Sequence, residues 1–532
     1  MRLGLVANIL GLFLVFAGVS MLLPVAVALI YMEEDLWANI TSAGICLLLG
    51  GAIYVATRTE RNRFELGHKE ALAVVTLGWI VFCLAGAMPY FFYASLPHFI
   101  FSSAPLKTAL IAGMDVQSVV GLVPDCRTLS GVGSEFCSFT NCLFESVSGF
   151  TTTGATIIEK GLWTDPFSRA GGLPHGLLMW RSLTQWMGGM GIIVFGIAVL
   201  PLLGVGGMQM FRAEVPGPTA DKLQPRIKDT AKALWLVYLM ITSLEAIMLV
   251  LAGQGIYLGV SHAFTTMATG GFSPLASSIE GMKSPFVHWV ITVFMFLAGV
   301  NFALHFQMLK GNTKSWIMDP EFRFYTVVFA GSALVISVFL VLNTHKTVSD
   351  AVLAGFFQSA SILTTTGYSN QDFVLWPLQT QFILFLLFFL GGCSGSTGGG
   401  PKCVRIFLLL KQAYRQVYQL IHPHAVAQVR LGKKVVPENV LQGAGGFFLL
   451  YLVCYAICSL VLSLAGIDFK TSLTAVGACL GNIGPGLGRV GPMANYSFFS
   501  DWIKWLLSFC MLLGRLELFT VFVLMVPEFW KK

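Results

Sequence analysis

Four short runs rich in threonine and glycine recur along the chain, and each one interrupts apolar sequence. They read FTTTGATI (150–157), MATGGFSP (267–274), LTTTGYSN (363–370) and, more loosely, GNIGPG (481–486). Their central glycines, which lie 117, 96 and 117 residues apart, are Gly154, Gly271, Gly367 and Gly484. A single run of this kind is typical of a surface turn. Four of them indicate a repeated functional element, and internal repeats are typical of transporters.

The sequence around the runs is that of a protein that crosses a membrane many times. Only 11% of the 532 residues are charged and 55% are hydrophobic, whereas soluble domains carry about 25% charged residues. About 20 apolar residues suffice to cross a bilayer. Ten stretches are predicted to span: 3–31, 36–57, 71–95, 176–204, 230–253, 286–309, 322–343, 380–412, 442–465 and 501–526. The first is too long for the apolar core of a cleaved signal peptide.

Basic residues predict the orientation of these spans. Most of the 33 lysines and arginines gather at the chain ends and in alternate loops, at 58–69, 212–232, 310–323 and 402–434. Positively charged loops stay in the cytoplasm, so both termini are predicted to be cytoplasmic, which agrees with an even number of spans. The same distribution explains the net charge of +7 without nucleic-acid binding.

Each Thr/Gly run ends a short, moderately apolar segment. The four segments read LFESVSGFTTTG, VSHAFTTMATGG, FFQSASILTTTG and LTAVGACLGNIG, and they are too short to span, which favours re-entrant helices. The predicted fold is an all-α membrane protein with two leading helices and four helix–pore loop–helix repeats around a pseudo-fourfold pore. The predicted boundaries are 1–60 for the leading helices and 61–210, 211–313, 314–434 and 435–532 for the repeats.

The Thr/Gly runs have the composition expected of an ion filter. Non-helical backbone at membrane depth is tolerated where it is buried or lines a watery cavity. Carbonyls of four loops that converge on one axis would repel one another unless a cation lay between them. Glycine leaves the axis clear, and threonine hydroxyls can brace the loops. The predicted filter residues are Thr152, Thr153, Gly154, Thr269, Gly270, Gly271, Thr365, Thr366, Gly367, Asn482, Ile483 and Gly484.

Five motifs carry a resemblance to a known family: WRSLTQWMGGMGI (180–192), MATGGFS (267–273), GGCSGSTGGGPKCVRI (391–406), GNIGPG (481–486) and GRLELF (514–519). Over essentially its whole length the chain resembles the Trk-type potassium uptake proteins, whose superfamily includes the Ktr and HKT transporters. Because glycine at the key position of all four loops goes with potassium preference in that family, the resemblance implies potassium as the transported and filter-bound ion. It also implies no organic cofactor, a homodimer in the bacterial inner (plasma) membrane, and a cytosolic nucleotide-binding regulatory subunit of the TrkA kind.

The run GGCSGSTGGG (391–400) interrupts the eighth predicted span. It lacks the Gly-Lys-Ser/Thr ending of a phosphate-binding loop, and its glycines hold a regular helix poorly. One alternative is a helix break that packs against a neighbour; the resemblance implies instead a flexible intramembrane loop that blocks the pore. The predicted gate residues are Gly392, Cys393, Ser394, Gly395, Ser396, Thr397, Gly398, Gly399, Gly400 and Arg515.

Arg515 lies near the middle of the last predicted span. A charge there costs roughly 2.5–3.5 kcal/mol even on lenient scales, so it needs a partner. Glu517 is two residues away and points to a different helix face. Arg515 is therefore expected to face the pore, to bond carbonyls of the Gly-rich loop and to oppose cations when the gate is shut, as the arginine at this place does in the family.

Three residues are weaker candidates. Glu145 either places negative charge near the outer mouth or is solvated in a loop. His262, at the matching place in the second repeat, is expected to be a packed or capping histidine. Arg181 is expected to anchor an external loop.

Two stretches depart from the family pattern. Residues 100–142 form a longer external loop with Cys126, Cys137 and Cys142, among which a disulfide is one possibility. Pro401 stands where the family often has an aliphatic residue.

The predicted function is potassium uptake rather than enzymatic catalysis. A potassium-binding subunit of an ATP-driven pump is the alternative on the same fold, although the two leading helices and GGCSGSTGGG argue against it. A membrane-embedded enzyme would need paired carboxylates or a metal cluster within spans, and a sodium-coupled solute carrier would need a substrate pocket. The sequence leaves open whether transport is passive or coupled to protons or sodium as a symport.

Overall fold

The computed structural model describes residues 3–58, 67–96, 132–166, 168, 172–191, 227–432 and 434–531. Within these ranges the chain is helical, with one short hairpin in which β1 (Arg430–Leu431) pairs antiparallel with β2 (Lys434–Val435). Apolar helices of membrane-spanning length recur from one end to the other. The chain is therefore an all-α membrane protein, as predicted.

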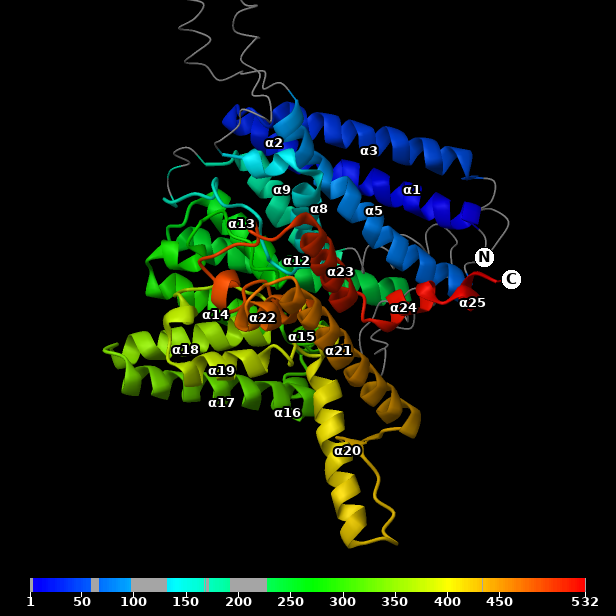
Figure 1. The fold of residues 1–532 in the computed structure, drawn as a ribbon, viewed down its shortest axis with the longest axis vertical. Helices are drawn as coiled ribbons and strands as arrows, with labels where there is room; N and C mark the ends of the chain where they lie inside the picture. Colours follow the sequence, from blue (N-terminus) through cyan, green and yellow to red (C-terminus); the bar gives the residue numbers. More distant parts are fainter. Residues whose placement is uncertain are drawn as a thin grey trace, which may run out of the picture.

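The N-terminal helices form a layer of their own. Figure 1 shows α1 (Leu3–Ser20), α3 (Leu36–Ala56) and α5 (His68–Ser95) packed side by side along one edge of the molecule. The helix α2 (Leu22–Tyr31) continues α1, and together they make a span of 29 residues. This pair of spans, α1–α2 and α3, corresponds to the two predicted leading helices.

Four short buried helices recur in the rest of the chain, and each lies between two other helices. They are α8 (Phe139–Phe150), α13 (Ile256–Met267), α18 (Val348–Leu363) and α22 (Phe469–Leu480). At 1.5 Å per residue, a 12-residue helix such as α8 reaches about 18 Å, well short of the ~30 Å hydrocarbon core of a bilayer. The helices that flank them are α5, α9 (His175–Trp186), α12 (Ile227–Leu251), α14 (Pro285–Ala298), α17 (Pro320–Asn343), α19 (Leu378–Leu387), α21 (Glu438–Leu464) and α23 (Asp501–Arg515).

The other elements of the described residues connect or follow these helices. They are η1 (Ser134–Cys137), the π-helix η2 (Met187–Gly191), η3 (Ser278–Met282), α15 (Phe302–Leu309), α16 (Lys314–Met318), η4 (Phe373–Leu375), α20 (Cys403–Ile421), η5 (Gly488–Val490), α24 (Phe519–Met525) and α25 (Pro527–Trp530).

Two predicted spans are bent pairs of helices and not single straight helices. The stretch 286–309 bends by 100° between α14 and α15, and 501–526 bends by 117° between α23 and α24. The second bend occurs at Glu517 and Leu518, which both have positive φ angles. Neither is a glycine or a proline, so the local sequence carries no sign of the break.

Six helices in the described part of the chain are long and apolar enough to span, and the two bent pairs raise this number to eight. Two predicted spans remain. The stretch 380–412 consists of α19 and α20, separated by the predicted interruption. The stretch 176–204 begins as α9 and η2, and its continuation after residue 191 lies outside the described residues.

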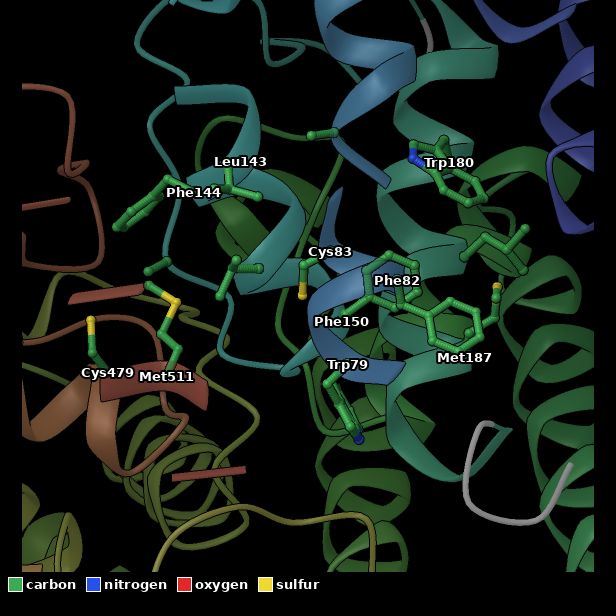
Figure 2. Close-up of a cluster of buried hydrophobic side chains, with 14 of the residues drawn as sticks. Trp79, Phe82, Cys83, Leu143, Phe144, Phe150, Trp180, Met187, Cys479 and Met511 are labelled. Atoms are coloured by element: carbon green, nitrogen blue, oxygen red, sulfur yellow. The ribbon is translucent and has the colours of Figure 1, made fainter. Parts of the chain in front are cut away.

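Aromatic side chains fill the core behind the first Thr/Gly run. Figure 2 shows Phe82 of α5, Phe150 of α8 and Trp180 of α9 among the buried residues there. The ring centroids of Phe82 and Phe150 are 5.6 Å apart, and those of Phe150 and Trp180 are 6.2 Å apart in an edge-on contact. Because Phe150 is the last residue of α8, this packing fixes the point at which the first run begins.

The cysteines of the predicted external loop differ in state. Cys142 is a free, buried thiol of α8, whereas Cys137 is disulfide-bonded. Cys126 and most of the predicted insertion, residues 97–131, lie outside the described residues.

The helix α20 projects from the body of the protein (Figure 1). Large apolar side chains are exposed along it, including Leu410, Tyr414 and Leu420. Past its middle, Arg415 pairs with Glu438 at the start of α21 at 2.9 Å. The hairpin β1–β2 follows α20 and leads into α21.

Candidate ion-conduction site

Each Thr/Gly run makes the same two-step turn directly after a short buried helix. The residues two places before the central glycines have φ angles of 54°, 54°, 60° and 53°, at Thr152, Thr269, Thr365 and Asn482. The central glycines have φ angles of 81°, 77°, 81° and 94°, at Gly154, Gly271, Gly367 and Gly484. A left-handed conformation costs a residue with a Cβ roughly 1–2 kcal/mol. Its recurrence at four places shows that the surroundings impose it.

The four central glycines form a closed ring with carbonyl oxygens of the neighbouring runs. A Cβ placed on each central glycine would lie very close to the backbone carbonyl oxygen of a residue in another run. The distance would be 2.3 Å from Gly154 to the Gly270 oxygen and 2.0 Å from Gly271 to the Thr366 oxygen. It would be 1.9 Å from Gly367 to the Ile483 oxygen and 2.5 Å from Gly484 to the Thr153 oxygen. Real Cβ atoms essentially never come within 3.0 Å of another atom, so a side chain at any of these positions would force the facing backbone to shift. The series closes on itself, and the twelve predicted filter residues therefore surround one axis. We call this arrangement the glycine ring.

Hydroxyl and amide groups brace the ring from behind. The hydroxyls of Thr151 and Thr153 are 2.8 Å apart, and the same pairing recurs at Thr364 and Thr366. Asn482 replaces the threonine of the fourth run and donates to the Thr153 hydroxyl at 3.0 Å. The first and fourth runs are thus linked by a side chain as well as by their backbones.

The short helices direct their carbonyl ends at the ring. The helices α8, α13, α18 and α22 end one to two residues before the left-handed residue of each run. A helix carries roughly half a negative charge at its C-terminus. Four such ends therefore surround the ring with partial negative charge, which favours a cation on the axis.

A cavity of roughly 170 Å³ opens on one side of the ring. It is lined by the four central glycines and by residues that follow each run, among them Thr156, Ser273, Ser369 and Tyr496. No residue of 388–402, the segment between α19 and α20, lines this cavity.

Glu145 and Arg181 form a buried ion pair beside this cavity. The Nε of Arg181 lies 2.6 Å from a Glu145 oxygen, and both side chains are almost fully buried. The interpretation of Glu145 as a solvated loop residue was wrong. Its carboxylate also accepts hydrogen bonds from the hydroxyl of Thr156 and the backbone N–H of Ile157. The pair therefore anchors the chain that leaves the first run.

His262 is buried within α13. Its Nδ1 lies 2.9 Å from the Leu258 carbonyl, and its Nε2 lies 3.0 Å from the Ser273 hydroxyl. Both ring nitrogens are thus engaged, which is the packed arrangement expected of this residue.

The Gly-rich loop, residues 388–402 between α19 and α20, lies against the other side of the ring. The backbone N–H of Gly399 donates to the Thr365 hydroxyl at 2.6 Å. A Cβ on Gly399 would lie 2.6 Å from the Cβ of Asn482. The Thr397 hydroxyl donates to the Met267 carbonyl, at the end of α13, at 3.0 Å. The loop thus touches the second, third and fourth runs or their helices.

The bend between α14 and α15 receives the Gly-rich loop. The N–H of Cys393 donates to the Gly299 carbonyl at 2.8 Å, and the N–H of Phe302 donates to the Gly395 carbonyl at 3.0 Å. These bonds occupy backbone groups that a continuous helix would have used internally. The bend is therefore explained by a contact with a distant segment.

Glu321, on α17, holds both ends of the Gly-rich loop. One of its carboxylate oxygens accepts from the N–H of Ser394 at 2.6 Å and from the N–H of Val404 at 3.1 Å. Ser394 lies near the start of the loop, and Val404 lies in the first turn of α20. Nothing in the sequence around Glu321 singles it out, and the sequence analysis missed it.

Arg515 lies between the Gly-rich loop and η2. Its Nη1 donates to the Thr397 carbonyl at 2.8 Å, and its Nη2 donates to the carbonyls of Gly188 and Gly189, the latter at 2.6 Å. Glu517 pairs with Arg405 instead of Arg515. The contact with the loop is the one that the sequence led us to expect, whereas the contact with η2 was not foreseen.

The described part of the chain contains no cluster of three or more His, Cys, Asp or Glu that could hold a metal ion. The polar groups around the axis are backbone carbonyls and hydroxyls, which suit a weakly held monovalent cation. The arrangement can bind and release an ion, and it supplies no acid–base pair for catalysis.

The fold and the ring define a class of protein: multi-pass helical membrane transport proteins in which four re-entrant loops surround one axis. A family model described as a cation transport protein, TrkH, matches residues 116–532. The chain belongs to this family of cation transport proteins, and it is a transport protein rather than an enzyme.

Relatives of the chain are similar over its full length. The Trk system potassium uptake protein TrkH of Escherichia coli (strain K12) is 38% identical, with 99% of each chain covered. The TrkH of Halomonas elongata is 36% identical with full coverage, and the TrkG of Escherichia coli (strain K12) is 32% identical. The crystal structure of the potassium transporter TrkH from Vibrio parahaemolyticus superposes with a TM-score of 0.80 at 34% identity, covering all of both chains.

Proposed function

We propose that the chain takes up potassium across the bacterial inner membrane, with the glycine ring as its selectivity filter. The observation that carries the proposal is the closed ring of glycines and carbonyls, because only a cation offsets the repulsion among carbonyls directed at one axis. The relatives described above are named potassium uptake proteins, which supports potassium as the ion. The membrane potential drives its entry with about 2.3 kcal/mol per charge per 100 mV.

The Gly-rich loop and Arg515 form the gate in this proposal. Residues Gly392 to Gly400 close the path below the ring, and the Arg515 guanidinium adds a positive charge that opposes a cation at that depth. Support comes from the bond between Arg515 and the Thr397 carbonyl, which ties the charge to the loop. Opening then requires that this bond break or that both groups move together.

The assembly is part of the proposal. The protein works as a homodimer with both termini in the cytoplasm, with a cytosolic nucleotide-binding subunit of the TrkA kind docked on the basic loops and α20. Its repeats occupy 61–210, 211–313, 314–434 and 435–532 after the leading helices at 1–60. The projection of α20 from the body, with its exposed apolar side chains, supports docking there.

The test is potassium-dependent growth and rubidium uptake in a host stripped of its own potassium transporters. Wild type should rescue growth at low potassium, and Gly154→Ser should weaken selection for potassium over sodium because the added side chain enters the ring. Absence of uptake by wild-type protein that reaches the membrane, with the regulatory subunit supplied, would contradict the proposal and favour the pump-subunit alternative.

A further inference from the structure

One face of α9 contacts the second Thr/Gly run with side chains from two successive turns. Arg181 donates from Nη1 to the Ser273 carbonyl at 2.9 Å. One turn further on, Gln185 reaches the ring itself. Side chains at i and i+4 share a helix face, so both act on the same run of the neighbouring repeat.

Gln185 holds the second run with two hydrogen bonds. Its Nε2 donates to the Gly270 carbonyl at 2.6 Å, and its Oε1 accepts from the N–H of Phe272 at 3.0 Å. The side chain is fully buried. A Cβ on Gly270 would lie only 2.3 Å from the Gln185 Cδ, so the small residue at 270 makes room for this contact.

The Gly270 carbonyl is one of the four oxygens of the glycine ring, the one that faces Gly154. Within the described part of the chain, no side chain donates a hydrogen bond to the corresponding oxygens of Thr153, Thr366 or Ile483. The second run is also the run whose residue before the central glycine is a glycine, without the threonine hydroxyl that braces the first and third runs. Gln185 thus supplies from another repeat the support that this run lacks.

We propose that Gln185 is a positioning residue that sets the selectivity of the ring for potassium over sodium by fixing the Gly270 carbonyl. A carbonyl oxygen has two lone pairs, so the Gly270 oxygen can accept the amide N–H and still face an ion on the axis. The amide fixes its direction and keeps it from following a smaller ion inward. This inference rests on the proposed function of the ring as a potassium filter.

Two substitutions separate the two bonds. Gln185→Leu removes both, whereas Gln185→Glu keeps an acceptor for the Phe272 N–H and loses the donor to the Gly270 carbonyl. The matched control is Gln381→Leu, because Gln381 is also buried and donates to two backbone carbonyls, those of Val374 and Trp376, at 2.8 and 2.7 Å. Those carbonyls lie in the loop after the third run and not in the ring.

The experiment measures rubidium and sodium uptake in proteoliposomes, together with the shift in melting temperature of purified protein on adding potassium or sodium. We expect the potassium-to-sodium preference to fall about tenfold in both Gln185 variants, the equivalent of one hydrogen bond of about 1.4 kcal/mol, and to be unchanged in Gln381→Leu. The melting measurement reports ion preference even if a variant transports poorly.

The outcomes separate this inference from the function on which it rests. If wild type shows no preference for potassium, the proposed filter itself fails. If wild type is selective and both Gln185 variants keep its preference, the filter stands and the role of Gln185 is overturned. A drop of the same size in Gln381→Leu would likewise overturn it, since the effect would then follow from any buried glutamine.

Discussion

The glycine ring and the Gly-rich loop are both glycine-rich segments inside the membrane, and they are held in place in opposite ways. The ring is built from four copies of one turn, and each copy is fixed by the backbone of the next at distances that leave no room for a Cβ. The Gly-rich loop occurs once, and separate hydrogen bonds hold it, some to side chains such as Glu321 and Arg515 and some to the backbone of the bend between α14 and α15.

This difference teaches what each segment can do. A closed set of backbone contacts cannot change at one point without changing at all four, which suits a site that must keep one diameter. Side-chain hydrogen bonds break singly at a net cost of about 1 kcal/mol each, which suits a segment that moves. The fixed ring and the movable loop are thus in direct contact, where the N–H of Gly399 donates to the hydroxyl of Thr365.

The largest expected effect comes from a methyl group in the ring. In Gly367→Ala the Cβ would lie 1.9 Å from the Ile483 oxygen at a residue with a φ angle of 81°. We expect rubidium uptake to fall about 100-fold or more, the equivalent of about 3 kcal/mol. In Gly398→Ala of the Gly-rich loop, the nearest atom would be 3.1 Å away, and uptake should change no more than a few-fold. Equal losses of uptake in the two variants would contradict the claim that the ring is more tightly fixed than the Gly-rich loop. The control is Gly331→Ala, whose Cβ would enter open space.

Loss of the gate arginine should have the next largest effect. Arg515→Gln removes the positive charge and weakens the bonds to the carbonyls of Thr397 and η2. We expect uptake without the regulatory subunit to rise about tenfold, because a charge in a low-dielectric path opposes cations strongly. Arg405→Gln, which removes the partner of Glu517, controls for the loss of a nearby arginine. Unchanged or lower uptake in Arg515→Gln would contradict the gating role.

Glu321 offers a smaller test on the same segment. Glu321→Leu leaves the N–H groups of Ser394 and Val404 without their acceptor, and a buried unsatisfied donor costs about 1–3 kcal/mol. We expect a lower melting temperature and a change in uptake of a few-fold, with selectivity for potassium unchanged. Glu321→Gln, which keeps an acceptor oxygen, should lie between the leucine variant and wild type. Altered selectivity in either variant would mean that the loop also shapes the ring.

The smallest effect on transport is expected at Asp35, which lies far from both segments, before α3. Burial, and next the charges of Glu33 and Glu34, raise the pKa of Asp35 from 3.8 to about 7. The folded protein therefore holds a proton that the unfolded chain has lost, so stability falls as the pH rises from about 4 to about 7 and then levels off. Asp35→Asn should remove this fall, so that its free energy of unfolding exceeds that of wild type by about 2–4 kcal/mol at pH 8. Uptake and selectivity should be unchanged. Parallel melting curves of wild type and Asp35→Asn from pH 5 to 8 would contradict the assignment.

The sequence predicts the ring better than the contacts that support it. The four runs share residues and precede spans at related intervals, and this repetition is visible without a structure. Gln185 lies within the motif WRSLTQWMGGMGI (180–192), yet the neighbouring residues do not show that its amide reaches another repeat. The same holds for Glu321 and for the bends after Ala298 and Arg515, which depend on segments about 70 to 120 residues away in the sequence. A feature that arises from repeated sequence segments can be predicted from one chain, whereas a feature that arises from contacts between distant segments cannot.

The attachment of the Gly-rich loop to α20 has a mechanical consequence. Helix α20 has 19 residues, so it is about 28 Å long, and its first turn is pinned at Val404 by the Glu321 carboxylate. Once the pair between Arg415 and Glu438 breaks, the helix is a lever with Glu321 as its fulcrum. A displacement of about 3 Å at the free tip turns the helix by about 6° and moves the adjoining loop by only a few tenths of an ångström. The geometry thus reduces a coarse push on the tip of α20 to a small fraction of the 2.6 Å length of the hydrogen bond that joins the loop to the ring.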